Sequence, residues 1–176
     1  TGAEAPPAGH VRCAPDLVTG NHAWSRLPAN APAVWTPEEQ AFLHGPVDQL
    51  CAMRDDWKIN WEWRDLPPEA WDFIKQNKFF GMIIPKHYGG LEFSAQAHSA
   101  VVSKVASRSG TAAVTVMVPN SLGPAELVLH YGTDEQKQKY LQRLACGREV
   151  PCFALTGPFA GSESGAVPGY GIVWDG

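Results

Sequence analysis

The sequence predicts a mainly α-helical domain followed by the first strand of a β domain. Helix-start signals precede apolar residues at helical spacing over most of the chain, and Gly and Pro separate these segments. After Gly147 the pattern changes to a short apolar run bounded by Pro and Gly, which is typical of a strand. The 176 residues therefore divide into a Pro- and Gly-rich leader or linker (1–35), a helical domain (36–148) and the start of a β domain that we expect to be truncated (149–176).

Composition and charge disfavour several classes of function. A net charge of −4 with no cluster of Lys and Arg leaves no basic surface for a phosphate backbone, so nucleic acid is not expected as a partner. The four cysteines form no CxxC pair and are expected to be reduced thiols that bind no metal. Neither a signal peptide nor an apolar run of about 20 residues is recognised. We therefore expect a cytoplasmic location, and membrane association of a longer parent chain stays open.

The first two helices are predicted from a capping signal and a helix breaker. Thr36 can cap a helix that begins at Pro37, and Glu39 can reach back to the cap. The pair Gly45-Pro46 ends this helix and begins the next. Apolar residues at helical spacing predict a buried face on the second helix, formed by Val47, Leu50, Cys51, Trp57 and Trp61. Trp63 and Trp71 are likewise expected in the core rather than in a ligand-stacking cluster.

Two further helices are predicted from Pro and Ser positions. The pair Pro67-Pro68 opens a helix that should end before Gly81, in an apolar stretch that neighbouring helices must cover. After a loop rich in turn residues, Ser94 can cap a helix that should end near Gly110. The chain is therefore predicted to be helical on both sides of this loop.

Residues 111–118 are ambiguous when taken alone. The segment is rich in β-branched residues, so propensity favours a buried strand. Beyond it, 124–130 is predicted to be helical, and Thr133 with Gln136 forms a second capping box at the start of another helix. The structure of 111–118 therefore depends on its tertiary context.

The segment after Gly147 is the one that could carry chemistry. Residues 150–156 form the predicted strand, and the turn that follows contains Gly157 and Gly161. Such a turn leaves backbone N–H groups outside any strand ladder, and Gly lets an anionic oxygen or a flavin carbonyl approach them. Taken alone, the pattern fits a plain strand-to-loop connection better than a ligand site.

Several motifs occur along the chain in a fixed order. Residues 155–163 read Leu-Thr-Gly-Pro-Phe-Ala-Gly-Ser-Glu, and further motifs precede them at 80–85, 88–90, 131–137 and 140–141. Together these motifs resemble the acyl-CoA dehydrogenase family, which has the form Leu-Thr-Glu-Pro-x-Ala-Gly-Ser-Asp at the entry to its middle β domain. The resemblance covers about Thr36 to Gly176, and the stretches 106–114 and 117–124 are similar to the bacterial fatty-acid β-oxidation branch.

The resemblance implies an FAD-dependent oxidoreductase. Such an enzyme removes the α proton of an acyl-CoA and passes the β hydrogen to the flavin as hydride, which gives a trans-2-enoyl-CoA. Backbone contacts to FAD are implied for Phe153, Leu155 and Thr156, and Gly161 belongs to the same flavin-binding turn. Ser162 is implied near the FAD pyrophosphate or the acyl-CoA substrate.

The resemblance also implies partners and the position of the catalytic base. Electron-transfer flavoprotein is the implied electron acceptor, and the full-length protein is implied to be a homo-oligomer. The catalytic Glu of the family belongs to its C-terminal helical domain, so we expect the base beyond Gly176 and an inactive fragment before it. We expect Glu92, Glu126 and Glu163 to be solvated instead. The family also implies a helix, not a strand, at 111–118.

A rival interpretation belongs to a different functional class. A non-catalytic helical module derived from the same family would act through protein–protein contacts of its apolar helix faces. In either case, helices that pack on a β domain would expose apolar patches in the isolated chain. The chain alone is therefore expected to be poorly soluble or self-associating.

Overall fold

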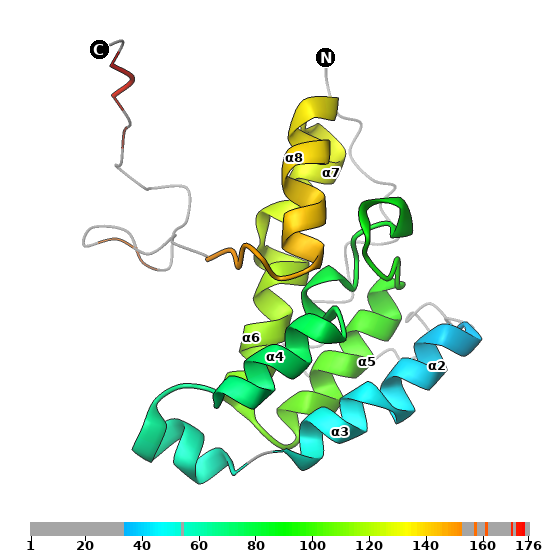
Figure 1. Ribbon diagram of the computed structural model, residues 1–176, viewed down its shortest axis with the longest axis vertical. Coiled ribbons are helices and arrows are strands. Elements are labelled where there is room, and N and C mark those ends of the chain that lie inside the picture. Colours follow the sequence, from blue (N-terminus) through cyan, green and yellow to red (C-terminus); the bar gives the residue numbers. More distant parts are fainter. Residues whose placement is uncertain are drawn as a thin grey trace, which may run out of the picture. The chain divides into compact units, whose positions relative to one another are not determined.

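The computed structural model describes residues 34–53 and 55–152 and, beyond them, 157, 161, 170 and 172–174. Within these residues the regular elements are helices, and they belong to one unit, Trp35–Gly176 (Figure 1). The predicted helical domain is confirmed. Most of the predicted leader and of the predicted β segment lies outside the described residues.

The first two helices, α2 (Pro37–His44) and α3 (Pro46–Ala52), begin where the sequence predicts. The hydroxyl of Thr36 accepts a hydrogen bond from the N–H of Glu39 at 3.2 Å. The carboxylate of Glu39 in turn accepts one from the N–H of Thr36 at 2.7 Å, so the predicted capping box is confirmed. Gly45 separates the two helices, and α3 packs against α5 (Ala95–Ala106).

The predicted burial of the tryptophan stripe is wrong beyond α3. Met53 and Asp55 are not helical, so the helix is interrupted after α3 and the phase of the pattern changes there. The chain then continues through Asp56 and Trp57 into a π-helical segment, η2 (Lys58–Trp63), which has more residues per turn than an α-helix. Ile59 faces the core and is 1% exposed. Trp57 and Trp61 are each 66% exposed, and Trp63 is 49% exposed.

Helix α4 (Pro68–Gln76) starts at the predicted Pro pair and leads into the short 3₁₀ segments η3 (Phe79–Gly81) and η4 (Lys86–Tyr88). Trp71 of α4 is partly buried against the main core, as expected for this tryptophan alone. The apolar stretch predicted to need cover is buried at both phenylalanines of η3 and at the residues that follow, Met82 and Ile84.

The ambiguous segment 111–118 is helical. It lies in α6 (Gly110–Met117) and the first residue of the π-helical η5 (Val118–Leu122). Helix α6 packs along α5, whose predicted cap is confirmed because Ser94 accepts a hydrogen bond from the N–H of Ala97. Tertiary burial therefore outweighs the strand propensity of this segment, and the buried side chains of α6 are Ala112, Ala113 and Val116.

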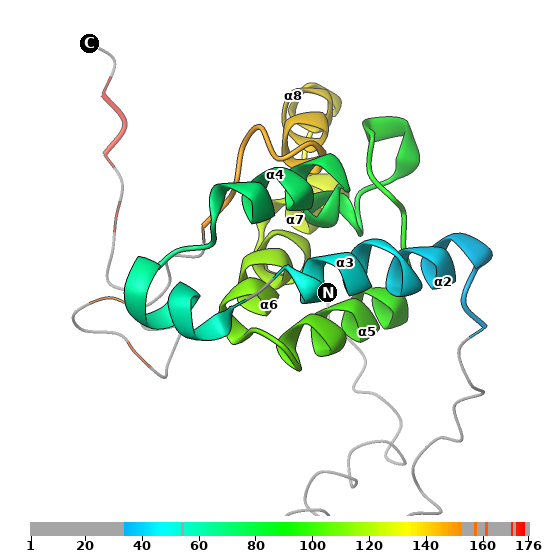
Figure 2. The ribbon, with the colours of Figure 1, turned by 60° about the horizontal axis from the view of Figure 1, so that its bottom comes forward.

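The last two helices form an antiparallel hairpin. Helix α7 (Pro124–Tyr131) is followed after two residues by α8 (Asp134–Ala145), and the two pack against each other (Figures 1 and 2). Thr133 and Gln136 form the second capping box, as predicted.

One long apolar segment, helical except at Gly123, contradicts an expectation from the sequence. Gly110–Tyr131, which joins α6, η5 and α7, is long and apolar enough to cross a membrane by length and composition. Core helices of soluble proteins pass the same test. Here part of the run is core, because Val116 and Ala125 are buried and Asn120 is hydrogen-bonded inside the domain.

The described residues form two separate apolar clusters. The larger one contains residues of α2 to α6 and of η2 and η3, and its fully buried members include Leu50, Ile74 and Phe79. The smaller one lies mostly within the α7–α8 hairpin and consists of Ile84, Ala125, Leu141, Leu144 and Ala145. The hairpin therefore has a core of its own.

Candidate functional site

An apolar cavity lies where the described chain leaves α8. It has a volume of about 310 Å³ and lies between α7, α8 and residues 149–151. Its lining consists of Pro124, Val128, Tyr140, Leu144, Glu149, Val150 and Pro151. Volumes of about 300–1,000 Å³ with mainly apolar walls are typical of small-molecule sites. The last residue that lines the cavity, Pro151, lies two residues before Phe153, the first predicted flavin contact.

One helix face beside this cavity is left exposed. Pro124, Leu127, Val128 and Tyr131 follow the i, i+3, i+4, i+7 spacing, so they form one apolar stripe along α7. Leu127 is 62% exposed and Tyr131 is 85% exposed. An exposed apolar stripe on a helix marks a surface that another element covers. We therefore expect the cavity and the stripe together to pack on a further domain.

The single acidic residue of the cavity is paired. Nε of Arg143 lies 3.1 Å from a carboxylate oxygen of Glu149, and both side chains are about two-fifths exposed. The Nε–H group of the Arg143 side chain forms no directed hydrogen bond among the described residues, so the contact is an ion pair only. A partly exposed pair of this kind contributes little stability. It nevertheless places a positive charge beside the one carboxylate in the cavity wall.

A buried amide fixes the loop between α4 and α5 onto η5. Asn120 is 2% exposed, and its side-chain NH₂ donates to the carbonyls of Phe79 at 2.7 Å and Val116 at 2.8 Å. Its carbonyl oxygen accepts a hydrogen bond from the N–H of Ile83 at 3.3 Å. These three bonds position the segment that contributes Ile84 to the core of the α7–α8 hairpin.

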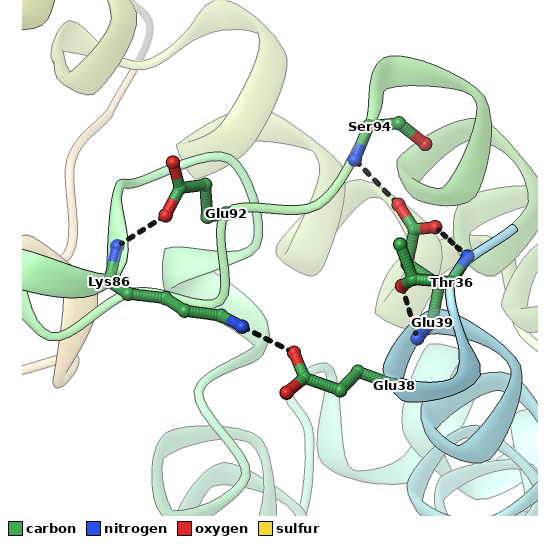
Figure 3. A network of polar contacts seen from close by, with 6 residues as sticks. All are labelled: Thr36, Glu38, Glu39, Lys86, Glu92 and Ser94. Atoms are coloured by element: carbon green, nitrogen blue, oxygen red, sulfur yellow. Dashed lines mark hydrogen bonds and ion pairs between the residues drawn. The ribbon is translucent and has the colours of Figure 1, made fainter.

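A second polar network joins three segments that are distant in sequence (Figure 3). One carboxylate oxygen of Glu39 accepts from the N–H of Thr36, and the other accepts from the N–H of Ser94 at 2.8 Å. Nearby, the Lys86 ammonium pairs with Glu38, and the Lys86 N–H donates to Glu92. The network ties the start of α2 to the loop before α5 and to the cap of α5.

The electrostatic state of Glu39 follows from these partners. Its side chain is buried, and burial by itself raises the pKa of a carboxyl group. The hydrogen bonds from Ser94 and Thr36 favour the charged form more strongly, and they lower the pKa of Glu39 from 4.5 to about 2. Glu39 is therefore a structural carboxylate that stays ionised across the physiological range.

Replacing Glu39 by glutamine is expected to lower the free energy of unfolding by about 2–3 kcal/mol near neutral pH. Because the folded-state pKa is depressed, this stabilisation is present above the unfolded pKa of 4.5 and is lost as pH falls toward 2. Urea denaturation at several pH values should show the wild-type chain losing stability over this window and Glu39→Gln losing less.

The control for this comparison is Glu38→Gln, which removes a neighbouring charge that is exposed and paired only with Lys86 among the described residues. It should change stability much less. Equal effects of the two substitutions at neutral pH would contradict the structural role of Glu39.

Comparison with known proteins identifies the helical domain. Residues 37–148 match the family model described as acyl-CoA dehydrogenase, N-terminal domain. The chain belongs to the acyl-CoA dehydrogenase family. The match begins at the first residue of α2 and ends three residues after α8, so it covers the whole described helical domain.

Individual acyl-CoA dehydrogenase relatives resemble only part of this chain. A 3-(aryl)acrylate reductase from Clostridium sporogenes is 41% identical over 103 residues, which are 58% of this chain and 27% of that protein. The caffeyl-CoA reductase-Etf complex subunit CarC from Acetobacterium woodii is 38% identical over 103 residues, with the same coverage of 58% and 27%. The chain thus spans about a quarter of the length of these curated relatives.

The fold agrees with a solved acyl-CoA dehydrogenase structure. Butyryl-CoA dehydrogenase from Megasphaera elsdenii matches with a TM-score of 0.64 and 22% identity, over 76% of this chain and 36% of that chain. At this identity the match establishes the fold alone. The helices α2 to α8 therefore share the fold of the matched region, and the family assignment rests on the match over residues 37–148.

The flavin contacts implied by the family stay a prediction. Phe153, Leu155, Thr156 and Ser162 lie outside the described residues. Gly161 is described, is exposed and lies in a bend, and a Cβ placed on it would meet no atom within 4 Å. The described residues therefore leave open space at this glycine.

The acidic residues that were expected to be solvated are exposed where the structure describes them. Glu92 and Glu126 are exposed, as predicted, and Glu163 lies outside the described residues. In the part of the chain that the structure describes, no three His, Cys, Asp or Glu residues are grouped so that they could hold a metal ion.

Sequence reasoning missed two structural residues. Asn120 was recognised only as part of a family motif, and Glu39 only as a helix cap, yet each joins segments more than 35 positions apart. A signal was present for Asn120, since it is a polar residue with Pro119 inside a long apolar run. No sequence signal predicts that Glu39 also accepts a hydrogen bond from the N–H of Ser94.

Proposed function

We propose that this chain is the N-terminal part of an FAD-dependent acyl-CoA dehydrogenase that oxidises acyl-CoA to trans-2-enoyl-CoA in fatty-acid β-oxidation. The observation that carries the proposal is the family match over 37–148, which ends directly before the predicted flavin segment. FAD, when bound, would supply the hydride-accepting chemistry. The finer assignment to fatty-acid oxidation rests on the resemblance of residues 106–124 to that branch of the family.

In this proposal the described helices contribute a wall, not the reacting groups. The exposed stripe of α7 and the cavity between α7 and α8 provide apolar surface beside the chain that leads to residues 153–162. Apolar walls exclude water from a site and strengthen the electrostatic interactions within it. In this proposal the apolar walls shape the site and exclude water from it.

The described carboxylates support the expectation that the catalytic base lies elsewhere. A base that abstracts a proton near neutral pH needs a pKa raised by desolvation. The one buried carboxylate among the described residues, Glu39, has its pKa lowered to about 2 instead. Glu149 is paired with Arg143, and Glu92 accepts a hydrogen bond from the backbone of Lys86. We therefore propose that chain 1–176 alone has no dehydrogenase activity.

A second candidate function is the reverse reaction, the reduction of an unsaturated thioester. Two relatives that are 41% and 38% identical are named as reductases of unsaturated substrates, an arylacrylate and caffeyl-CoA. A flavoenzyme of this family could thus reduce an enoyl or arylacryloyl thioester. Anaerobic assays in both directions, with saturated and unsaturated thioesters, separate the two candidates.

An electron-transfer flavoprotein is the proposed redox partner. The CarC relative is named as a subunit of a complex with Etf, which supports this choice. The partner would remove electrons in the dehydrogenase direction and supply them in the reductase direction. A reduced enzyme that is reoxidised by electron-transfer flavoprotein far faster than by oxygen would agree with the proposal.

A flavin titration tests the proposal directly. Purified chain 1–176 is titrated with FAD and followed by fluorescence, beside the longest polypeptide that the gene encodes. We expect no saturable binding to chain 1–176, because the flavin site is incomplete, and stoichiometric binding with thioester-dependent bleaching in the longer polypeptide. Tight FAD binding by chain 1–176 would refute the proposal that its flavin site is incomplete. A longer polypeptide that reacts with no CoA thioester would favour the non-catalytic module.

A further inference from the structure

Three tryptophans are exposed together on the segment that connects α3 to α4. In both ribbon views this segment, drawn in teal, stands away from the neighbouring helices (Figures 1 and 2). Trp57 and Trp61 pack on each other with ring centroids 5.7 Å apart, and each is 66% exposed. Trp63, at the end of η2, is 49% exposed. Isolated exposed apolar residues are common, but three neighbouring tryptophans mark a binding surface.

The segment is nevertheless held in place. Ile59 is buried in the main core, so its side chain anchors η2 to the helical domain. The side chain of Asn60 accepts a hydrogen bond from the hydroxyl of Thr111 on α6 and donates to the backbone carbonyl of Asp56 at 2.9 Å. The exposed rings therefore belong to an ordered, preorganised segment, which reduces the entropic cost of binding.

A groove continues this aromatic surface toward α4. It has a volume of about 630 Å³ and is lined by Trp63, Asp65, Leu66, Pro67, Pro68, Glu69, Trp71 and Asp72. One oxygen of Asp65 accepts hydrogen bonds from Trp71 Nε1 and from the N–H of Leu66, so this carboxylate fixes the Trp71 ring. Within the described residues, Glu69 and Asp72 have no hydrogen-bond or ion-pair partner and are exposed. We call the groove together with Trp57 and Trp61 the tryptophan surface.

The negative charge of the tryptophan surface favours a positively charged partner. Residues 55–72 contain six acidic side chains and two basic ones, and the groove lining contains three carboxylates and no Lys or Arg. The one lysine of this segment, Lys58, pairs with Asp55 at 3.5 Å and lies 6.0 Å from the Trp63 ring. Aromatic faces and carboxylates together bind Arg and Lys side chains.

We propose that the tryptophan surface docks an arginine- or lysine-bearing segment of a partner protein, a binding function separate from the redox chemistry. Its cationic side chains stack on Trp63 and pair with Glu69 and Asp72. The apolar parts of the partner segment cover Trp57 and Trp61.

The size of the surface favours a short segment over a second copy of this chain. A tryptophan buries about 150–250 Å² at most. At their exposed fractions, Trp57, Trp61 and Trp63 together supply about 270–450 Å², below the roughly 800 Å² per partner of a stable interface. A bilayer is the less favourable occupant, because anionic lipid head groups repel the acidic groove.

The test measures binding of a defined cationic probe to intact chain 1–176. A fluorescein-labelled octapeptide of alternating Arg and Pro is titrated and followed by fluorescence anisotropy, with a Glu–Pro octapeptide as its matched control. We expect saturable binding of the Arg peptide with Kd on the order of 10–100 µM, weakened by salt, and none of the Glu peptide. Glu69→Gln/Asp72→Asn should weaken binding about tenfold, as should Trp63→Ala.

Two control variants separate this surface from general electrostatic attraction. Glu126→Gln/Asp134→Asn removes the same charge from α7 and α8, and Tyr131→Ala removes a ring there that is more exposed than Trp63. Both should bind the Arg peptide as tightly as wild type, with unchanged helical circular dichroism in all variants. Absence of saturable binding, or equal weakening in the controls, would overturn the proposal. Binding to neutral phosphatidylcholine vesicles that Trp63→Ala abolishes, without peptide binding, would overturn it in favour of a bilayer.

Discussion

Replacing Gly90 by alanine is expected to cost about 3 kcal/mol or more of stability, enough to unfold a marginal domain. A Cβ at this position would lie 2.0 Å from the carbonyl oxygen of Ile84 and 2.6 Å from its carbonyl carbon. That carbonyl already accepts a hydrogen bond from the N–H of Glu92 at 3.0 Å, so it cannot move without breaking the loop. Thermal and urea denaturation of Gly90→Ala measure the loss.

Two glycine controls separate this clash from other glycine effects. Gly89 has φ of +87° and open space around its Cα, so Gly89→Ala should cost only the backbone strain of about 1 kcal/mol. Gly110 begins α6 with open space and no positive φ, so Gly110→Ala should be neutral or stabilise by up to about 1 kcal/mol. A Gly90→Ala variant no less stable than Gly89→Ala would contradict the close approach.

Replacing Asn120 by alanine is expected to lower the free energy of unfolding by about 3 kcal/mol. The substitution removes three hydrogen bonds and leaves the carbonyl of Phe79 and the N–H of Ile83 without this partner inside the domain. Because these bonds hold the loop beneath the α7–α8 hairpin, the loss should also raise amide hydrogen exchange at Ile83 and Ile84.

Neighbouring and isosteric variants test this account of Asn120. Ser121 is exposed and donates only to the carbonyl of Met117, so Ser121→Ala should change stability by less than about 0.5 kcal/mol. Asn120→Asp keeps the size of the side chain but places a buried carboxylate against two carbonyl oxygens, and it should be at least as destabilising as alanine near neutral pH. An Asn120→Asp variant that loses little free energy of unfolding would show that the shape of the side chain, not its hydrogen bonding, fixes the loop.

The helix starts could be predicted because their determinants are local. Thr36, Ser94 and Thr133 each accept the expected backbone hydrogen bond, and both capping boxes form. Helix α6 required more than local information, because β-branched residues favour a strand there. Its burial against α5 decided the structure, and only the family resemblance predicted that outcome in advance.

The wrong prediction for the tryptophans has a specific physical cause. A periodicity of 3.6 residues was extended past Ala52, where α3 ends, and across the non-helical Asp55 into a separate segment that becomes π-helical at Lys58. The interruption of the helix before Asp56 shifted the pattern, so Trp57 and Trp61 are exposed and Ile59 fills the core. Sequence periodicity cannot reveal such a change, because the hydrogen-bond pattern of the segment depends on its anchoring by Asn60 and Thr111.

The candidate site was predictable only in its position along the chain. The change of pattern after Gly147 located the exit from the helical domain, and the family match ends at 148. The cavity between α7 and α8 could not be predicted, because it depends on how residues 149–151 fold back on the hairpin. The flavin contacts of Phe153, Leu155, Thr156 and Ser162 stay predictions.

The separate core of the α7–α8 hairpin has a consequence for how the domain opens. The buried members of its cluster belong to α7 and α8 except for Ile84, although Tyr88 and η3 also pack on the hairpin. We therefore expect the hairpin to melt as a cooperative unit while α2 to α6 stay folded. Native-state hydrogen exchange should then show one lower opening free energy for all protected amides of α7 and α8. Such a unit would let the hairpin adjust to a neighbouring domain without unfolding the helices that support it.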